Sequence, residues 1–272
     1  WRIDAPDKPE LSCNVSTLVR RPSERRRGWD WLRRFNVNLG PEIVVGPRHL
    51  DELPRGAPPI YFAAGRTCAR LLPEAVPQGG KVAVILAHGQ GLDADSQVVS
   101  PLRKAIHKEL RFHTLSLQMP VLAGQRTPEL FKAYASTFPD AYTRIQAGID
   151  FLKKEKGVER IYLMGYSMGG RMTSAFLADH PDASVVGYVG VGLTAGGPDP
   201  LNTNINLHRV RVPVIDVYAE DDNDAQFAAY RRRFLSERFV QVPIPGAKHD
   251  YRGHERQVVE AVLAWLRKQE QR

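Results

Sequence analysis

Cysteine is scarce in this sequence, which limits how the chain can be cross-linked or bind metal. The 272 residues include two cysteines, Cys13 and Cys68, and neither belongs to a CxxC or zinc-ligand pattern. A cysteine-based zinc site and a disulfide-rich scaffold are therefore excluded. One disulfide between Cys13 and Cys68 would suit an exported protein, and two unrelated buried thiols are the alternative interpretation.

Long apolar runs are also missing. The longest run, at 82–87, is long enough for a strand but far too short for a membrane-spanning helix. We find no internal repeat, no long low-complexity segment and no signal-peptide pattern. Because the chain begins with Trp1 and not with methionine, we expect a processed product. A removed export signal would place the protein in the periplasm or outside the cell, and a cytoplasmic location is the alternative.

Acidic residues are outnumbered by basic ones. Lysine and arginine total 38, aspartate and glutamate total 30, and the formal net charge is +8. The densest basic cluster interleaves arginines with tryptophans: Arg20, Arg21, Arg25, Arg26, Arg27, Trp29, Trp31, Arg33 and Arg34. Such a composition can bind nucleic acid, but no DNA- or RNA-binding motif accompanies it. We therefore expect no nucleic-acid partner and interpret the cluster as a solvated N-terminal arm whose tryptophans pack on the body.

The pattern along the chain changes near residue 80. Residues 1–80 form an irregular, proline- and arginine-rich leader, in which strand-like pieces at 42–45, 60–63 and 67–72 are expected at one edge of a sheet. After it, we expect strands at 81–87, 112–118, 160–164, 184–191, 212–218 and 239–244, and helices at 98–110, 142–154, 169–180, 225–237 and 257–269. This alternation predicts parallel strands joined by crossover helices, and the continuous apolar runs predict strands covered on both faces. We therefore predict an α/β fold with one three-layer domain at 81–272.

Residues 165–170, Gly-Tyr-Ser-Met-Gly-Gly, contain a G-x-S-x-G motif between an expected strand and an expected helix. The glycines leave room for strand and helix to approach closely, and the turn lifts the Ser167 hydroxyl above the sheet edge. The N-terminus of the following helix favours developing negative charge. We predict that Ser167 is a nucleophile; a glycine-rich turn with an incidental serine is the alternative.

A serine nucleophile needs a base, usually a histidine that a carboxylate orients. In this type of fold the chain order is serine, acid, histidine. His249 lies directly after the last expected strand, so we predict it as the base, with His254 in reserve. His180, at a helix end before a proline, and His208, at the wrong end of a strand, fit this role less well.

The acid is expected in the loop after the strand at 212–218, where residues 219–224 read Ala-Glu-Asp-Asp-Asn-Asp. Four carboxylates crowd this loop. Asp222 is our first choice and Asp221 the second. Asp224 is expected to cap the helix that starts at Ala225.

The loop at 88–91, His-Gly-Gln-Gly, follows the first strand of the predicted domain. Acyl transfer requires two backbone N–H groups directed at the developing oxyanion. We expect one from Met168, the residue after the nucleophile, and the other from Gln90, while His88 has a structural role. A plain turn is the alternative for this loop.

Together, the loop at 88–91, the turn at 165–170, the loop at Asp222 and the pair His249-Asp250 resemble the α/β-hydrolase superfamily, over about residues 70–272. Ser-Pro-Leu-Arg at 100–103 and Thr-Leu-Ser-Leu-Gln-Met-Pro at 114–120 resemble a bacterial group of these hydrolases without an assigned substrate. The resemblance implies an eight-stranded, mostly parallel sheet with helices on both faces and an acyl-enzyme mechanism. Ala219 departs from the glycine usual at that position.

The expected activity is hydrolysis of a small-molecule or lipid-like carboxylic ester by Ser167, His249 and Asp222, with no metal or organic cofactor. The same residues could transfer the acyl group to another acceptor or cleave an amide, and the sequence does not separate these reactions. A third hypothesis is a non-catalytic module whose basic arm docks to an envelope or an acidic polymer.

Overall fold

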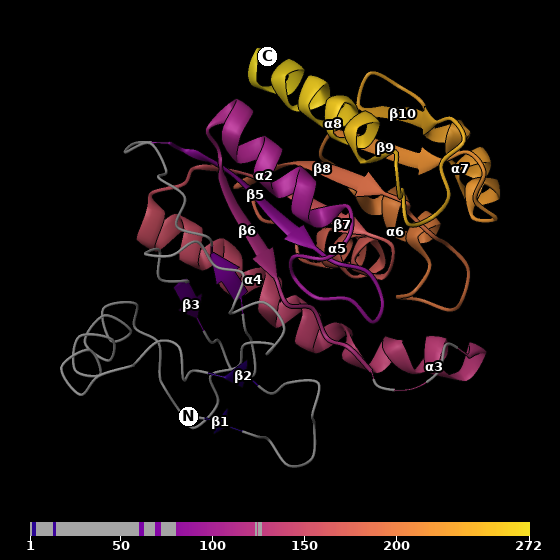
Figure 1. Ribbon diagram of the computed structural model, residues 1–272, viewed down its shortest axis with the longest axis horizontal. Coiled ribbons are helices and arrows are strands. Elements are labelled where there is room, and N and C mark those ends of the chain that lie inside the picture. Colours follow the sequence, from indigo (N-terminus) through magenta and orange to yellow (C-terminus); the bar gives the residue numbers. More distant parts are fainter. Residues whose placement is uncertain are drawn as a thin grey trace.

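The computed structural model describes residues 80–122, 124 and 127–272 and, before residue 80, the backbone of four short strands (Figure 1). The expected disulfide between Cys13 and Cys68, the expected strand at 42–45 and the basic cluster at 20–34 all lie outside the described residues and side chains.

Eight strands form the main sheet, in the spatial order β10-β9-β8-β7-β5-β6-β4-β3. Their bounds are β3 (Ile60–Phe62), β4 (Ala69–Leu71), β5 (Val82–Ala87), β6 (His113–Leu117), β7 (Arg160–Tyr166), β8 (Val185–Val191), β9 (Val214–Ala219) and β10 (Phe239–Ile244). Strands β5 to β10 run parallel, whereas β4 pairs antiparallel with β6 and with β3. The short strands β1 (Arg2–Ile3) and β2 (Cys13–Asn14) pair separately with each other. The predicted eight-stranded, mostly parallel sheet is confirmed.

Helices cover both faces of this sheet. They are α2 (Val99–Leu110), α3 (Pro128–Ala133), α4 (Phe138–Lys156), α5 (Met168–Asp179), α6 (Thr203–Arg209), α7 (Ala225–Arg231) and α8 (Glu255–Glu270). Successive residues of β5 point into different cores: Ile85 packs with residues of α4 and α5, and Leu86 packs with residues of α2 and α8. Figure 1 shows α2 and α8 side by side on one face of the sheet. The three-layer prediction is thus confirmed, and burial on both faces explains the continuous apolar strands.

Two helix bounds differ from those expected. The helix expected at 225–237 ends at Arg231 and continues only as a short 3-10 helix, Arg232–Phe234. Helix α4 begins at Phe138 and not at 142. Pro139 does not prevent this earlier start, because it lies in the first turn, where the N–H that proline lacks would have no partner within the helix.

The sequence pattern does not predict α3 or α6. These helices have 6 and 7 residues, about two turns or less, so amphipathic periodicity barely develops. Their N-caps carry the local signal instead. The Thr127 hydroxyl accepts a hydrogen bond from the Leu130 amide at 3.2 Å, and the Asn202 side chain accepts one from the Asn204 amide at 3.1 Å.

The carboxyl ends of the parallel strands meet at one edge of the sheet, where ligands bind in open α/β folds. Gln90 follows β5, Ser167 follows β7, Asp222 follows β9 and His249 follows β10. Residues far apart in the chain therefore come together at this edge. None of the helices in the described part of the chain is both long and apolar enough to cross a membrane.

Candidate active site

The turn between β7 and α5 holds Ser167 in a strained backbone conformation, with φ at 52° and ψ at −116°. A positive φ is uncommon for a residue with a side chain, and such strain persists only where the surroundings impose it. The Ser167 amide donates to the carbonyl oxygen of Val191 at 3.2 Å, and its carbonyl accepts from the Arg171 amide at 3.2 Å. The turn is therefore anchored to both the sheet and the helix.

Two glycines permit this turn, because α5 lies almost in contact with β7 and with the end of β5. A Cβ atom at Gly165 would lie 2.2 Å from Thr173 Oγ1, and one at Gly169 would lie 2.4 Å from the carbonyl oxygen of His88 and 2.5 Å from that of Ala87. At Gly169 the obstacle is backbone, which cannot rotate away as a side chain can. No larger residue fits there unless the strand or the helix shifts.

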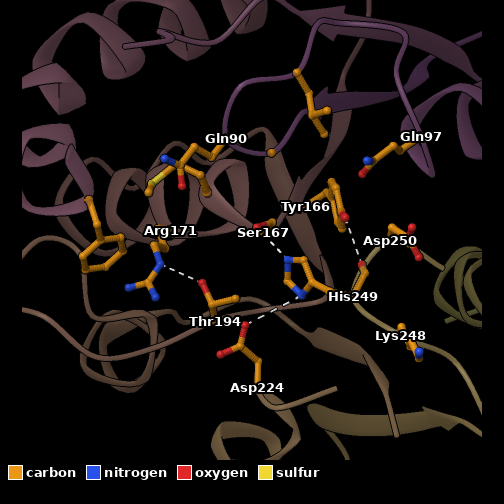
Figure 2. Close-up of a pocket in the computed structure, with 14 residues that line it drawn as sticks. Gln90, Gln97, Tyr166, Ser167, Arg171, Thr194, Asp224, Lys248, His249 and Asp250 are labelled. Carbon is orange, nitrogen blue, oxygen red and sulfur yellow. Dashed lines mark hydrogen bonds and ion pairs between the residues drawn. The ribbon is translucent and has the colours of Figure 1, made fainter. Parts of the chain in front are cut away.

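Ser167, His249 and Asp222 form a continuous chain of hydrogen bonds. Ser167 Oγ lies 2.9 Å from His249 Nε2, and His249 Nδ1 lies 2.6 Å from Asp222 Oδ2; Figure 2 shows the serine and the imidazole facing each other. A ring protonated at Nδ1 satisfies both contacts, because Nδ1–H donates to the carboxylate and Nε2 accepts the hydroxyl proton. In this arrangement the imidazole can remove the proton from Ser167.

The other aspartates of the loop have different surroundings. The Asp221 amide donates to the carbonyl oxygen of Ala247 at 3.0 Å, and the residue is exposed. The expectation that Asp224 caps α7 is wrong: Asp224 occupies the N-cap position but makes no side-chain cap bond. Its φ of −76° and ψ of −6° are helical, unlike the extended backbone of a capping residue. Its Oδ2 instead lies 3.7 Å from His249 Nδ1.

Asp222, Asp224 and His249 are also a group that could hold a cation, because their ligand atoms all lie within 4.8 Å of one another. However, His249 Nδ1 already faces Asp222 Oδ2 at 2.6 Å. A metal ion would have to displace the Nδ1 proton and break the contact that orients the ring toward Ser167. The geometry therefore favours a proton over a metal ion at this position.

The remaining candidate histidines lie away from Ser167. His254 is the N-cap residue of α8, and its Nδ1 contacts the carbonyl oxygen of Arg252 at 3.3 Å. The His180 ring packs against Tyr142 at the end of α5, and the His208 ring packs against Phe234. The position of a histidine after the last parallel strand was the signal that separates His249 from these three.

Tyr166 supports His249, a role that the sequence does not indicate. Its hydroxyl donates a 2.9 Å hydrogen bond to the carbonyl oxygen of His249, and the two ring centroids lie 5.6 Å apart. Tyr166 is buried. The residue before Ser167 therefore fixes the backbone that carries His249, which links the turn after β7 to the loop after β10.

His88 is a buried structural residue of the loop after β5, as expected. Its Nδ1 donates to the carbonyl oxygen of Gly89 at 2.8 Å, and its Nε2 accepts from the Met119 amide at 2.9 Å. Burial lowers the pKa of His88 from 6.5 to about 4, so the ring is neutral near pH 7. The imidazole therefore joins the loop after β5 to the segment that follows β6.

A cavity of about 500 Å³ opens at Ser167 and His249. Met168 and Gln90, the expected oxyanion-hole residues, both line it. Met168 begins α5, so its amide is one of the helix amides that have no partner within the helix. The cavity lining is mixed in polarity and consists of Gly89, Gln90, Leu92, Gln97, Phe131, Tyr166, Ser167, Met168, Arg171, Thr194, Asp224, Lys248, His249 and Asp250.

Arg171 in the cavity wall is a second feature that the sequence does not indicate. Its guanidinium is buried over the Phe131 ring, 4.6 Å from the ring centroid, and Nε donates to Thr194 Oγ1 at 2.7 Å. Its terminal nitrogens donate to the backbone carbonyls of Ala195, Gly196 and Leu201. Burial lowers its pKa to about 10, which leaves it charged near pH 7. One cation thus joins α5 to the loop at 194–201 on the rim of the cavity.

Residues 80–267 match the family model of the alpha/beta hydrolase domain, which is more than half of the chain. The chain belongs to the alpha/beta hydrolase family. No curated protein matches this hydrolase in sequence.

Solved structures share the fold of the hydrolase. Est1E from Butyrivibrio proteoclasticus aligns with a TM-score of 0.60 and 19% identity, over 79% of this chain and 99% of that one. A dienelactone hydrolase from Anabaena variabilis has a TM-score of 0.61 and 19% identity, and the alignment covers 78% of this chain and 97% of that one. A serine hydrolase without lid from Xanthomonas campestris has a TM-score of 0.59 and 16% identity, and the alignment covers 79% of this chain and 95% of that one. At these identities the likeness concerns the fold, and together with the family it supports hydrolase activity.

Proposed function

We propose that this hydrolase cleaves carboxylic esters through an acyl-enzyme formed on Ser167. The observation that carries the proposal is the hydrogen-bond chain from Ser167 through His249 to Asp222, at a strained turn that opens into a cavity. A serine hydroxyl is a weak nucleophile near neutral pH, and this chain supplies the base and the carboxylate that activate it.

In the first half of the reaction, Ser167 Oγ attacks the ester carbonyl carbon while its proton passes to His249 Nε2. The amides of Met168 and Gln90 donate hydrogen bonds to the oxyanion, and loss of one such donor costs on the order of 100–1,000-fold in rate. The carbon–oxygen bond then breaks, and the alcohol leaves with the proton from His249. Asp222 stabilises the imidazolium throughout.

In the second half, water attacks the acyl-enzyme and gives a proton to His249. The acid leaves, and the proton returns to Ser167. An alcohol or amine that enters in place of water would give acyl transfer, and an amide substrate would give amidase activity with the same residues. Product analysis with and without an added alcohol separates hydrolysis from transfer.

The cavity favours esters of compact acids. Charged side chains lie around it, among them Arg171, Asp224 and Lys248, and its apolar surface is interrupted. Long alkyl chains gain free energy only where apolar surface removes them from water. Est1E, which shares the fold, is known with bound ferulic acid, so aromatic acyl groups belong in the ester panel.

The test compares hydrolysis of nitrophenyl esters by the wild type with that by Ser167→Ala, His249→Ala and His254→Ala. We expect the first two variants to lose at least about 1,000-fold in kcat/KM, because each removes a member of the hydrogen-bond chain. His254→Ala is the matched control and should stay within about threefold of the wild type. Hydrolysis that survives Ser167→Ala, or a larger loss in His254→Ala than in His249→Ala, would refute the proposal.

A further inference from the structure

A second carboxylate faces the nitrogen of His249 that contacts Asp222. Asp224 Oδ2 lies 3.7 Å from His249 Nδ1, and Asp222 Oδ2 lies 2.6 Å from the same atom. Figure 2 shows the carboxylate of Asp224 directed at the imidazole across the cavity from Gln90. Two aspartates from one loop therefore share one imidazole nitrogen.

The side chain of Asp224 has no hydrogen-bond partner within the described part of the chain. It caps no helix, and no amide or hydroxyl in that part donates to its oxygens. Its backbone amide donates to Asp222 Oδ1 at 3.2 Å, which fixes the spacing of the two carboxylates. An oriented, partly buried carboxylate without a structural partner needs another explanation, and the facing imidazole supplies one.

The charges around His249 come from several elements. Asp222 and Asp224 lie in the loop after β9, Arg171 lies on α5 and Arg231 on α7. Arg231 is paired with Asp216 at 2.8 Å, whereas the acceptors of Arg171 among the described residues are neutral oxygens. Tyr166 contacts the ring and the backbone carbonyl of His249, and Lys248 and Asp250 flank it in the chain.

The neighbouring charges shift the pKa of Asp224 in opposite directions. Burial raises the pKa of Asp224, and the neighbouring charge of Asp222 raises it further, whereas His249 and Arg171 lower it. The imidazolium that forms when His249 takes the serine proton adds a cation beside the two carboxylates. Arg171 is a second positive charge that acts on Asp224, so the protonated imidazole and Arg171 together oppose the repulsion between the two carboxylates.

We propose that Asp224 is a second acid of this site, a positioning residue that stabilises the His249 imidazolium and replaces Asp222 as the Nδ1 partner when Asp222 is lost. The proposal rests on the proposed function. In the proton transfer, the Ser167 proton moves to His249 Nε2, the Nδ1 proton stays on the ring, and both carboxylates stay ionised. A movement of roughly 1 Å would bring Asp224 Oδ2 within hydrogen-bond distance of Nδ1.

The test measures kcat, KM and the pH profile of kcat/KM for the wild type, Asp224→Asn and Asp221→Asn. Removal of a negative charge beside the imidazolium makes His249 a weaker base. We expect Asp224→Asn to lower kcat about threefold to tenfold at unchanged KM and to move the acidic limb of the profile to lower pH by roughly half a unit. Asp221→Asn removes the same charge from an exposed position of the same loop and should leave the limb in place. Asp224→Glu keeps the charge and should keep the limb near that of the wild type.

A double-mutant cycle tests the replacement of Asp222. In the Asp222→Asn background, Asp224→Asn should cost at least about tenfold more than it costs in the wild type, because it then removes the remaining acid. Equal losses in both backgrounds, together with the same acidic limb in Asp224→Asn and Asp221→Asn, would overturn the proposal. Unchanged activity in Ser167→Ala would instead refute the proposed function, so the two failures are distinguishable.

Discussion

The aspartates in the loop after β9 differ in what their polar atoms contact. Asp222 reaches Nδ1 at 2.6 Å, whereas the neighbouring Asp221 is exposed and contacts the loop after β10 through its backbone amide. The bend that presents Asp222 to the ring therefore turns Asp221 outward. Position within the loop, and not the number of carboxylates, determines which aspartate contacts His249 Nδ1.

We expect Asp222→Asn to reduce kcat/KM by more than about 100-fold and Asp221→Asn by less than about threefold, because only Asp222 stabilises the imidazolium directly. In a serine protease the equivalent change costs about 10,000-fold, and Asp224 should make the loss smaller in this hydrolase. Steady-state kinetics on one nitrophenyl ester measures both variants. A large loss for Asp221→Asn with a small one for Asp222→Asn would move the acid to Asp221.

Sequence reasoning predicted which residues the fold places together where chain order and strand ends determine position. Ser167, Asp222 and His249 each follow a parallel strand, and such positions must meet at one edge. It failed for Asp224, because an aspartate before a helix resembles a cap until its backbone angles are known. It missed Tyr166, whose partner is a backbone carbonyl 83 positions away.

At the scale of elements, the contact between the end of β5 and α5 depends on Gly169. We expect Gly169→Ala to destabilise the fold by at least about 1–3 kcal/mol, because its Cβ would meet backbone oxygens at 2.4 and 2.5 Å. Urea unfolding measures the change. The control is Gly148→Ala on α4, whose Cβ would meet only side-chain ends at 3.3 Å or more. Equal stability of the two variants would show that strand and helix separate easily.

The link between the loop after β5 and the segment after β6 depends on neutral His88. Its pKa is about 4 in the fold against 6.5 in an unfolded chain, so the unfolded chain binds more protons between these values. Stability is therefore lost as the pH falls from 6.5 toward 4, by up to about 3 kcal/mol at 1.4 kcal/mol per unit. Urea unfolding at pH 7 and pH 4.5 should show a smaller loss in His88→Gln, by about 2 kcal/mol. The same pH dependence in both proteins would contradict this role.

Elements with a long apolar pattern were predictable, and so were the short edge strands β3 and β4, whereas the short helices α3 and α6 were not. The six parallel strands and the longer helices follow from periodicity, because burial on one or both faces dictates residue type over many positions. Helices α3 and α6 depend on single capping residues, Thr127 and Asn202. A cap specifies where a helix begins but not that one forms, so the pattern alone does not reveal these two.

For the whole molecule, the open cavity and its charged lining bear on substrate size. We expect kcat/KM for nitrophenyl acetate or butyrate to exceed that for the laurate by at least about tenfold, because the cavity offers little continuous apolar surface for a twelve-carbon chain. A chain-length series measures this at concentrations below micelle formation. A rate that rises steadily with chain length would show that the acyl chain binds elsewhere.

Covalent labelling tests the central claim, that Ser167 is the nucleophile, most directly. The protein is treated with a fluorophosphonate, its intact mass is measured, and the modified peptide is sequenced. We expect one adduct per chain, located on Ser167, with no adduct in Ser167→Ala and strongly slowed labelling in His249→Ala, since the hydroxyl then lacks its base. An adduct on another residue, or labelling of Ser167→Ala at the wild-type rate, would contradict the assignment.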